Sequence, residues 1–244
     1  MTTEAIAIVT GATGGMGREI VAELARTHHV YALGRNDDAL AELGALSNVT
    51  PVSTDLVTDL LGGAEAPSPV ARLLDLTRID VVVHAAAVAT KFSVESARVA
   101  DWRTALDINV VVPAELTRRV LPALRAARGT VVFINSGAGR GSYGDNIVYA
   151  ATKHALYAVA DGLRKAESRA GVRVSTVAPG PTDTPMLERL QAQSGAEYVA
   201  EHYIEPVEVA RAVRTVVDAG PSAQITDISV RPRIEVGDRK PPRG

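Results

Sequence analysis

Tyr149 and Lys153 are the residues of this sequence whose spacing points most directly to chemistry. Residues four apart share one face of a helix, so the two side chains should point into the same space. An ammonium near a phenol favours the phenolate and lowers its pKa from about 10 toward the working range. Tyr149 could then act as a general acid or base. Ser136, at the expected end of a strand, could orient the reacting oxygen by a hydrogen bond.

A glycine-rich turn near the N-terminus forms a second candidate site. The segment from Thr10 to Gly17 is Thr-Gly-Ala-Thr-Gly-Gly-Met-Gly, and it joins a predicted strand to a predicted helix. Gly11 permits a sharp turn, Gly15 lets backbone approach a pyrophosphate, and Gly17 lets the helix pack closely on the strand. The helix N-terminus adds N–H donors and a partial positive charge. The predicted dinucleotide-binding residues here are Gly11, Thr13, Gly14, Gly15, Met16 and Gly17.

The end of the second predicted strand indicates which dinucleotide binds. Folds of this kind normally place an acid there to bind the ribose 2′-hydroxyl. Gly34 and Arg35 take its place here, so no carboxylate at that position repels a 2′-phosphate. Arg35 can bind such a phosphate through charge-assisted hydrogen bonds. The sequence therefore favours NADP(H), with NAD(H) as the alternative because Asp37 and Asp38 could still reach a ribose.

Asp55 and Leu56 follow the third predicted strand. Asp55 has two interpretations that the sequence leaves open. Its carboxylate could accept a hydrogen bond from the adenine amino group, or it could cap the helix that follows.

Strands and helices alternate along the chain, which predicts an α/β fold. Predicted strands cover residues 5–10, 30–33, 49–53, 81–84, 130–135, 172–178 and 225–230. Predicted helices run from the glycine turn to about residue 29 and over residues 37–46, 69–77, 97–125, 147–170 and 206–219, with Pro113 as a candidate break point in the fourth. Strands joined by helices run parallel through right-handed crossovers. We therefore expect a doubly wound parallel sheet, a Rossmann fold of about seven strands flanked by helices.

No shift of composition marks a linker, so we expect a single domain over residues 1–236. Residues 61–69 are predicted to form a surface connection. Residues 182–205 are polar, helical in pattern and close to the expected ligand crevice, which predicts a mobile substrate lid. Residues 237–244 are predicted to be a flexible tail.

Composition and charge exclude several functional classes. The 244 residues are 46% hydrophobic and 22% charged, as in ordinary globular proteins. A net charge of −2 and a pI of 6.2 disfavour binding to nucleic acid or anionic membrane. The sequence has no cysteine and no paired-histidine motif, so no metal site is expected. No apolar run approaches the length of a membrane span and no signal pattern is present, which predicts a cytoplasmic protein.

Over nearly its whole length the chain resembles the short-chain dehydrogenases/reductases, through Thr-Gly-x-x-x-Gly-x-Gly at Thr10 to Gly17 and through Tyr149 and Lys153. The resemblance implies an oxidoreductase that transfers a hydride between NADP(H) and a small carbonyl or secondary alcohol substrate. Tyr149 would be the acid/base, Ser136 would position the substrate oxygen, and Lys153 would also hold the nicotinamide ribose. Asn109 would help to hold a water in a proton relay through the lysine. The family also implies a homodimer or homotetramer formed through the helices at 97–125 and 147–170.

The resemblance extends the predicted cofactor site beyond the glycine turn. Ala85 and Ala86 would lie beside the cofactor, and the segment that contacts the nicotinamide carboxamide is matched by Pro179, Gly180, Thr182 and Thr184. Two departures are visible. His84-Ala-Ala-Ala stands where many members carry Asn-Asn-Ala-Gly, and we interpret His84 as structural or buried and neutral rather than as a catalytic base. Gly14 stands where NADP-preferring members often carry a basic residue.

Two other functions on the same fold serve as alternatives. A sugar-nucleotide epimerase or dehydratase that retains NAD would carry a larger C-terminal substrate domain. A non-catalytic NADP(H)-binding sensor would be expected to lack Tyr149 or Lys153, and both are present. Substrate identity depends on residues 88–94, 137–147 and 182–203, whose mixed character fits ketones, sugars, polyols or steroids alike.

Overall fold

The computed structural model describes residues 4–62, 68–142 and 144–238. Within them, one parallel sheet has the strand order β3-β2-β1-β4-β5-β6-β7. Its strands are β1 (Ile6–Thr10), β2 (His29–Gly34), β3 (Val49–Ser53), β4 (Val81–His84), β5 (Thr130–Ile134), β6 (Arg173–Pro179) and β7 (Asp227–Val230). This confirms the predicted doubly wound sheet.

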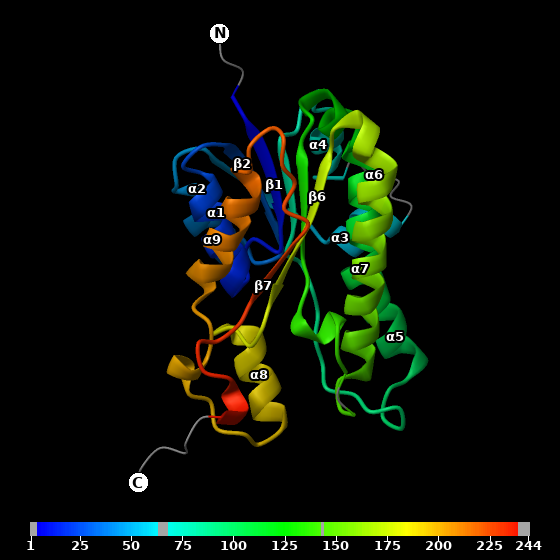
Figure 1. The fold of residues 1–244 in the computed structure, drawn as a ribbon, viewed down its shortest axis with the longest axis vertical. Helices are drawn as coiled ribbons and strands as arrows, with labels where there is room; N and C mark the ends of the chain where they lie inside the picture. The colour runs from blue at the N-terminus through cyan, green and yellow to red at the C-terminus, as the bar shows by residue number, and fades with distance from the viewer. Residues whose placement is uncertain (1–3, 63–67, 143, 239–244) are drawn as a thin grey trace.

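Helices cover both faces of the sheet (Figure 1). They are α1 (Gly15–Leu24), α2 (Asp37–Gly44), α3 (Leu56–Leu61), α4 (Ala71–Leu74), α5 (Val99–Leu106), α6 (Val112–Ala127), α7 (Ile147–Glu167), α8 (Pro185–Gln193) and α9 (Pro206–Val217). α1, α2 and α9 pack on one face, and α3, α4, α6 and α7 pack on the other. Ala7 and Val9 of β1 belong to the first core and Ile8 to the second, because successive strand side chains point to opposite faces.

The long helix predicted over residues 97–125 is three segments in the structure. α5 continues through a π-helical turn, η1 (Asp107–Val111), into α6. Pro113 has no N–H to bond the carbonyl of Asn109, so the ladder is interrupted there and the turn widens. The predicted break point near Pro113 is therefore real, and it lies beside a candidate site residue.

The predicted helices before residues 29 and 77 are much longer than the observed α1 and α4. α1 ends at Leu24 because His29 N already donates to Ala5 O at 2.8 Å, as the first residue of β2. The helix predicted over residues 69–77 shrinks to α4 because Ile79 N donates to Ala123 O at 3.2 Å and draws the chain toward β4. In both places tertiary pairing overrides local helical propensity.

The C-terminal ends of β1 and β4 lie side by side, with Thr10 paired to His84. The order of the strands reverses between them, because β1 leads toward β3 on one side and β4 toward β7 on the other. Ligands of open α/β sheets bind at such a switch point, outside the carboxyl ends of the strands. A ligand site is therefore expected among the loops after β1, β4, β5, β6 and β7.

Residues 182–205, the predicted lid, contain α8 and a 3-10 turn, η4 (Ala200–His202). The two ends of this segment are joined, since Asp183 N donates to Ile204 O at 2.9 Å and Ile204 N donates to Pro181 O at 3.0 Å. α8 lies at the lower end of the view in Figure 1, below the ends of β6 and β7. The position fits a lid, and its mobility stays a prediction.

The predicted tail and the connection over residues 61–69 lie partly outside the described residues. Gly237 and Asp238 end a 3-10 turn, η5 (Val236–Asp238), whereas 239–244 and 63–67 are not among the residues described. In the described part of the chain, no helix has the length and apolar character of a bilayer span.

Candidate active site

Tyr149 and Lys153 lie one turn apart near the start of α7. Lys153 is 2% exposed, and its Nζ donates a hydrogen bond to the carbonyl oxygen of Ile134 at 2.9 Å. The same Nζ is 5.6 Å from the centre of the Tyr149 ring. The predicted juxtaposition is therefore present, and β5 fixes the lysine through the last residue of the strand.

Burial shifts both pKa values. It lowers the pKa of Lys153 to about 8 and raises the pKa of Tyr149, while a hydrogen bond from Ser136 acts on Tyr149 in the opposite direction. The spacing alone predicted that Lys153 would lower the pKa of Tyr149. The direction in the structure is the reverse, because desolvation of the phenol dominates and the lysine bonds to Ile134.

Ser136 follows β5 directly, and its Oγ accepts a hydrogen bond from Ala138 N at 3.2 Å. Its neighbour Asn135 is a positioning residue that sequence reasoning missed. Asn135 Oδ1 accepts from Ser136 N at 2.9 Å, and its Nδ2 donates to the backbone oxygen of Lys153 at 3.2 Å. One buried amide thus holds the end of β5 against α7. The sequence feature that could have indicated this role is the position of Asn135 at the end of a predicted strand, next to Ser136.

Asn109 lies in the π-helical turn η1 and is 1% exposed. Its Oδ1 accepts from Val88 N at 2.8 Å, and its Nδ2 donates to Val88 O at 2.9 Å and to Thr152 Oγ1 at 3.0 Å. Thr152 Oγ1 in turn donates to Tyr149 O at 2.8 Å. The amide therefore ties the loop after β4 to the helix of the tyrosine. Thr152 had no role in the sequence prediction.

The glycine turn has the close contacts that a dinucleotide cradle requires. Gly11 has a φ of +65°, and a Cβ on it would lie 2.6 Å from Ala86 N. A Cβ on Gly17 would overlap the carbonyl oxygen of Gly11. Thr10 Oγ1 accepts hydrogen bonds from Ala85 N and Ala86 N, each at 3.2 Å, and so holds the loop after β4 against the turn. These contacts leave no space for a side chain at Gly11 or Gly17, so only glycine lets the turn fold this tightly.

The N-terminus of α1 fits phosphates. Gly14 is its N-cap, has no side chain to cap the helix, and no acid lies in the first turn. A Cβ on Gly15 would come within 2.8 Å of Thr184 Cγ2, so the turn faces the start of α8 across a narrow gap. N–H groups at the end of a ten-residue helix attract anions. Thr13 and Met16 flank these glycines in the chain.

At the end of β2, Gly34 packs against Thr13, because a Cβ on Gly34 would lie 2.7 Å from Thr13 Cγ2. Arg35 is exposed, and its Nη1 is 3.7 Å from Asp55 Oδ2. Asp55 caps α3 by accepting hydrogen bonds from Val57 N and Thr58 N, both at 3.1 Å. These backbone donors, foremost that of Thr58, lower the pKa of Asp55. Of its two interpretations the structure shows the cap, with Leu56 as the first residue of α3.

The loop after β6 folds back on itself beside the glycine turn. Thr182 Oγ1 donates to Gly180 O at 3.0 Å, and Thr184 Oγ1 donates to Thr182 O at 3.3 Å. Thr184 also caps α8 by accepting from Leu187 N at 3.3 Å. Pro179, the last residue of β6, is buried. The predicted residues of this loop are therefore brought to the same edge as Gly15 and Ser136.

His84 is buried and stacks on Phe133, with ring centres 5.0 Å apart. Its Nε2 contacts Thr117 Oγ1 at 2.8 Å, and Thr117 already donates to Pro113 O, so His84 is the donor. Burial lowers the pKa of His84 to about 3. It is therefore neutral and structural, as interpreted from the sequence.

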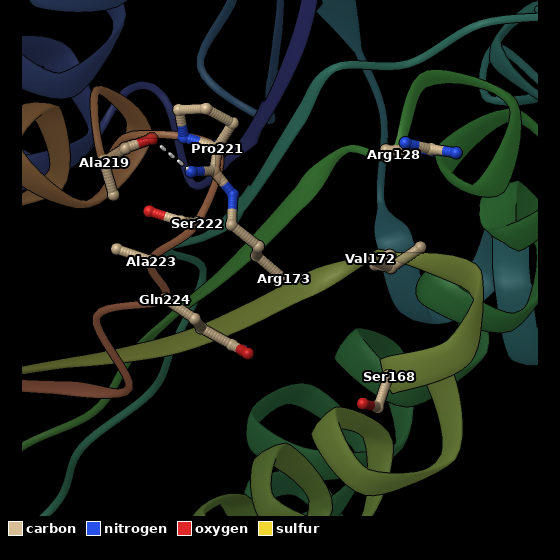
Figure 2. Close-up of a pocket in the computed structure, with 10 residues that line it drawn as sticks. Arg128, Ser168, Val172, Arg173, Ala219, Pro221, Ser222, Ala223 and Gln224 are labelled. Atoms are coloured by element: carbon tan, nitrogen blue, oxygen red, sulfur yellow. Dashed lines mark hydrogen bonds between the residues drawn. The ribbon is translucent and has the colours of Figure 1, made fainter.

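A pocket of about 570 Å³ lies elsewhere, at the opposite edge of the sheet (Figure 2). Arg173, the first residue of β6, lines it, but its guanidinium donates to Ala219 O at 2.6 Å, Val217 O at 3.2 Å and Thr130 Oγ1 at 3.1 Å. These contacts fix the C-terminal end of α9. None of the candidate active-site residues lines this pocket, and the hydrogen bonds of Arg173 give it a structural role.

Comparisons with known proteins agree with this geometry. The short chain dehydrogenase family matches residues 5–195. A short-chain type dehydrogenase/reductase of Sinorhizobium fredii is 31% identical over 95% of this chain and 92% of its own. A solved short-chain dehydrogenase/reductase of Corynebacterium glutamicum is 46% identical, with a TM-score of 0.71 over 93% of this chain and all of that one. A solved serine dehydrogenase complexed with NADP+ is 26% identical, with a TM-score of 0.74 over 93% of both chains. The chain therefore belongs to the short-chain dehydrogenase/reductase family of NAD(P)-dependent oxidoreductases.

Proposed function

We propose that the protein reduces a carbonyl compound to an alcohol, and catalyses the reverse oxidation, with Tyr149 as the general acid/base. The observation that carries this proposal is the convergence of Ser136, Tyr149 and Lys153 from β5 and α7 at the ligand edge of the sheet. Two hydroxyl groups and a buried ammonium at one place match the needs of proton transfer to a developing alkoxide.

The chain's own residues supply the proton. Because burial raises the pKa of Tyr149, its hydroxyl is protonated at neutral pH and acts as the acid in the reductive direction. Ser136 orients the substrate oxygen, and as the tyrosine proton moves to that oxygen, the ammonium of Lys153 stabilises the phenolate that remains. Asn109 and Asn135 hold α7, and with it Tyr149 and Lys153, in place through their hydrogen bonds to Thr152 and to the backbone of Lys153. A nicotinamide cofactor, when bound, supplies or accepts the hydride.

Three segments would hold that cofactor: the glycine turn, the loop after β4 that Thr10 fixes through Ala85 and Ala86, and the loop from Pro179 to Thr184. We propose NADP(H) as the preferred form, since Arg35 is exposed beyond β2 where a 2′-phosphate would lie. A structural relative, the serine dehydrogenase, is solved with NADP+. Asp55 accompanies Arg35 and could also accept a hydrogen bond from adenine at its exposed face.

We also propose that the protein is a homodimer or homotetramer. Val99 and Leu106 of α5, with Val94 before it and Val111 after it, are exposed apolar side chains on one stretch of chain. A second copy would remove them from water. Light scattering at micromolar protein tests this, and a monomeric mass would contradict it.

A titration followed by a turnover assay tests the function. Fluorescence titration with NADPH and NADH should show tighter binding of NADPH, and a panel of carbonyl compounds should then oxidise NADPH. The Tyr149→Phe variant is the matched control, because it should bind NADPH and lose turnover. Equal turnover by this variant would contradict the assignment of the acid.

A further inference from the structure

A cavity of about 570 Å³ lies at the edge of the sheet opposite the candidate active site (Figure 2). Its volume is within the range of about 300–1,000 Å³ that small-molecule sites occupy. One wall is formed where α6 and α7 end, and the other by the connection from α9 to β7. Figure 2 shows Arg128, Ser168 and Val172 on the first wall and Pro221, Ser222 and Ala223 on the second.

Arg128 is a cation without a partner at this cavity. Its side chain is exposed, and its guanidinium has neither a hydrogen bond nor an ion pair within residues 4–62, 68–142 and 144–238. The stem of the side chain lies along Gly171, because a Cβ on Gly171 would be 3.4 Å from Arg128 Cγ and Cδ. In the same described residues, the hydroxyl groups of Ser168 and Ser222 also have no hydrogen-bond partner. Polar donors are therefore available on both walls.

The surroundings of the cavity leave it positively charged. None of the described residues that line it carries a carboxylate. Glu167, next to Ser168 in the chain, pairs with Arg125 at 2.8 Å, and its charge is therefore offset. The second wall is fixed to β6, because Gln224 Nε2 donates to Val174 O at 2.9 Å. An anion would enter a preformed site with no negative side chain to repel it.

We propose that this cavity binds a small phosphate monoester and that Arg128 binds its phosphate group. The proposal does not depend on the proposed oxidoreductase function. A guanidinium and two hydroxyl groups offer enough donors for the three terminal oxygens of a phosphate, and more than the two oxygens of a carboxylate need. Val172, Pro221 and Ala223 offer apolar surface to the organic part of the ester.

The backbone of Arg128 makes the test selective for binding. Arg128 follows the last residue of α6 and has a left-handed backbone, with a φ of +51°. Helices commonly end on glycine in this conformation, and asparagine also tolerates it, whereas a larger side chain raises its energy. Arg128→Gly and Arg128→Asn should therefore fold with a Tm no lower than that of the wild type while losing the guanidinium.

Calorimetric titration of glycerol phosphate into the full-length protein tests the proposal. Saturating NADP+ is present, because the glycine turn at the start of α1 is the other expected phosphate site. Both Arg128→Gly and Arg128→Asn should raise the Kd for glycerol phosphate about 10-fold or more, as expected when charge-assisted hydrogen bonds are lost. Arg169→Gln is the matched control, because it removes an exposed arginine next to Ser168 that does not line the cavity, and it should keep the wild-type Kd.

Three further probes define the chemical class of the ligand. Glycerol should not bind, since it lacks the charge. Glycerate, which carries a carboxylate, and inorganic phosphate, which lacks the organic part, should both bind more weakly than glycerol phosphate. Equal binding of glycerate would overturn the assignment to phosphates, and equal binding of inorganic phosphate would overturn the assignment to esters.

The variants also locate the site. No binding of glycerol phosphate to the wild type, or the same Kd in the wild type and in both Arg128 variants, would overturn the proposal. A Kd that rises only in Arg35→Gln would place the phosphate at the glycine turn and overturn it as well. Tyr149→Phe should bind glycerol phosphate as the wild type does, so a failure of the proposed function is distinguished from a failure at the cavity.

Discussion

Lys153 Nζ donates its hydrogen bond to Ile134 O at 2.9 Å while lying 5.6 Å from the centre of the Tyr149 ring. The ammonium is buried, and its pKa falls to about 8 because charged nitrogen loses hydration there. A buried cation with one carbonyl partner costs stability, and such a cost is typical of a functional site.

Replacing Lys153 should change how stability depends on pH. The pKa of Lys153 falls from 10.5 in the unfolded chain to about 8 in the folded one. Between these values the unfolded chain binds a proton that the folded chain has released, so the free energy of unfolding rises with pH. From about pH 7.5 to about pH 9.5, the wild type should gain about 2 kcal/mol relative to Lys153→Met. Urea denaturation of both proteins at both pH values measures this, and parallel curves would refute the shifted pKa.

Removing the Tyr149 hydroxyl should abolish most turnover. We expect Tyr149→Phe to lower kcat by at least about 100-fold with little change in the Kd for NADPH, since general acid catalysis is worth about 10²- to 10⁴-fold. Steady-state assays of NADPH oxidation measure kcat, and a fluorescence titration measures the Kd for NADPH.

Tyr157→Phe is the control for this experiment. Tyr157 lies on the same helix, burial raises its pKa to about 12, and the guanidinium of Arg140 lies 5.0 Å from its ring centre. Its hydroxyl has no place in the proposed proton transfer, so turnover should stay near the wild-type rate.

Removing the Asn109 amide should loosen the site. Asn109→Ala removes three hydrogen bonds and leaves the backbone of Val88 without its partners. We expect the free energy of unfolding to fall by about 2–4 kcal/mol. Asn36→Ala, which removes the exposed cap of α2, should cost only about 1 kcal/mol. Urea denaturation measures the free energy of unfolding of both variants. Equal losses would show that the buried Asn109 amide stabilises the protein no more than the exposed cap does.

Replacing Arg35 should change cofactor preference. We expect Arg35→Gln to raise the Kd for NADPH about 10- to 100-fold and to leave that for NADH within about twofold, because only NADPH carries the 2′-phosphate. Arg26→Gln removes an exposed arginine that pairs with Glu23, and should change neither value. If Arg35→Gln weakened the binding of NADPH and of NADH alike, Arg35 would not be the residue that distinguishes the two cofactors.

Adding one methyl group to Gly11 should disrupt the glycine turn. Gly11 has a φ of +65°, and its new Cβ would lie 2.6 Å from Ala86 N. Gly195 has nearly the same φ, +64°, but nothing lies within 4 Å of its Cβ position. Gly195→Ala should therefore cost about 1–2 kcal/mol, the left-handed backbone penalty alone. Gly11→Ala should lower the free energy of unfolding clearly more than that, and it should weaken NADPH binding. Thermal melts compare the two variants, and a similar fall in Tm for both would argue against a tight contact between residue 11 and Ala86.

The sequence by itself determined the alternating elements, the glycine turn and the pairing of Tyr149 with Lys153. These features depend on local rules: strand and helix periodicities, the conformational freedom of Gly11, and the four-residue spacing that puts side chains on one helix face. The same rules located a break near Pro113, because a missing N–H interrupts a helix wherever it occurs.

Only the tertiary structure decided where α1 and α4 end, since Ala5 and Ala123 lie far away in the chain and supply the competing backbone partners. It also decided the sign of the Tyr149 pKa shift, because desolvation depends on everything packed around the phenol and spacing on one helix cannot reveal it. The positioning role of Asn135 has the same origin. Its amide joins the end of β5 to the backbone of Lys153, 18 residues later, and the two meet only because α7 packs beside the end of the strand.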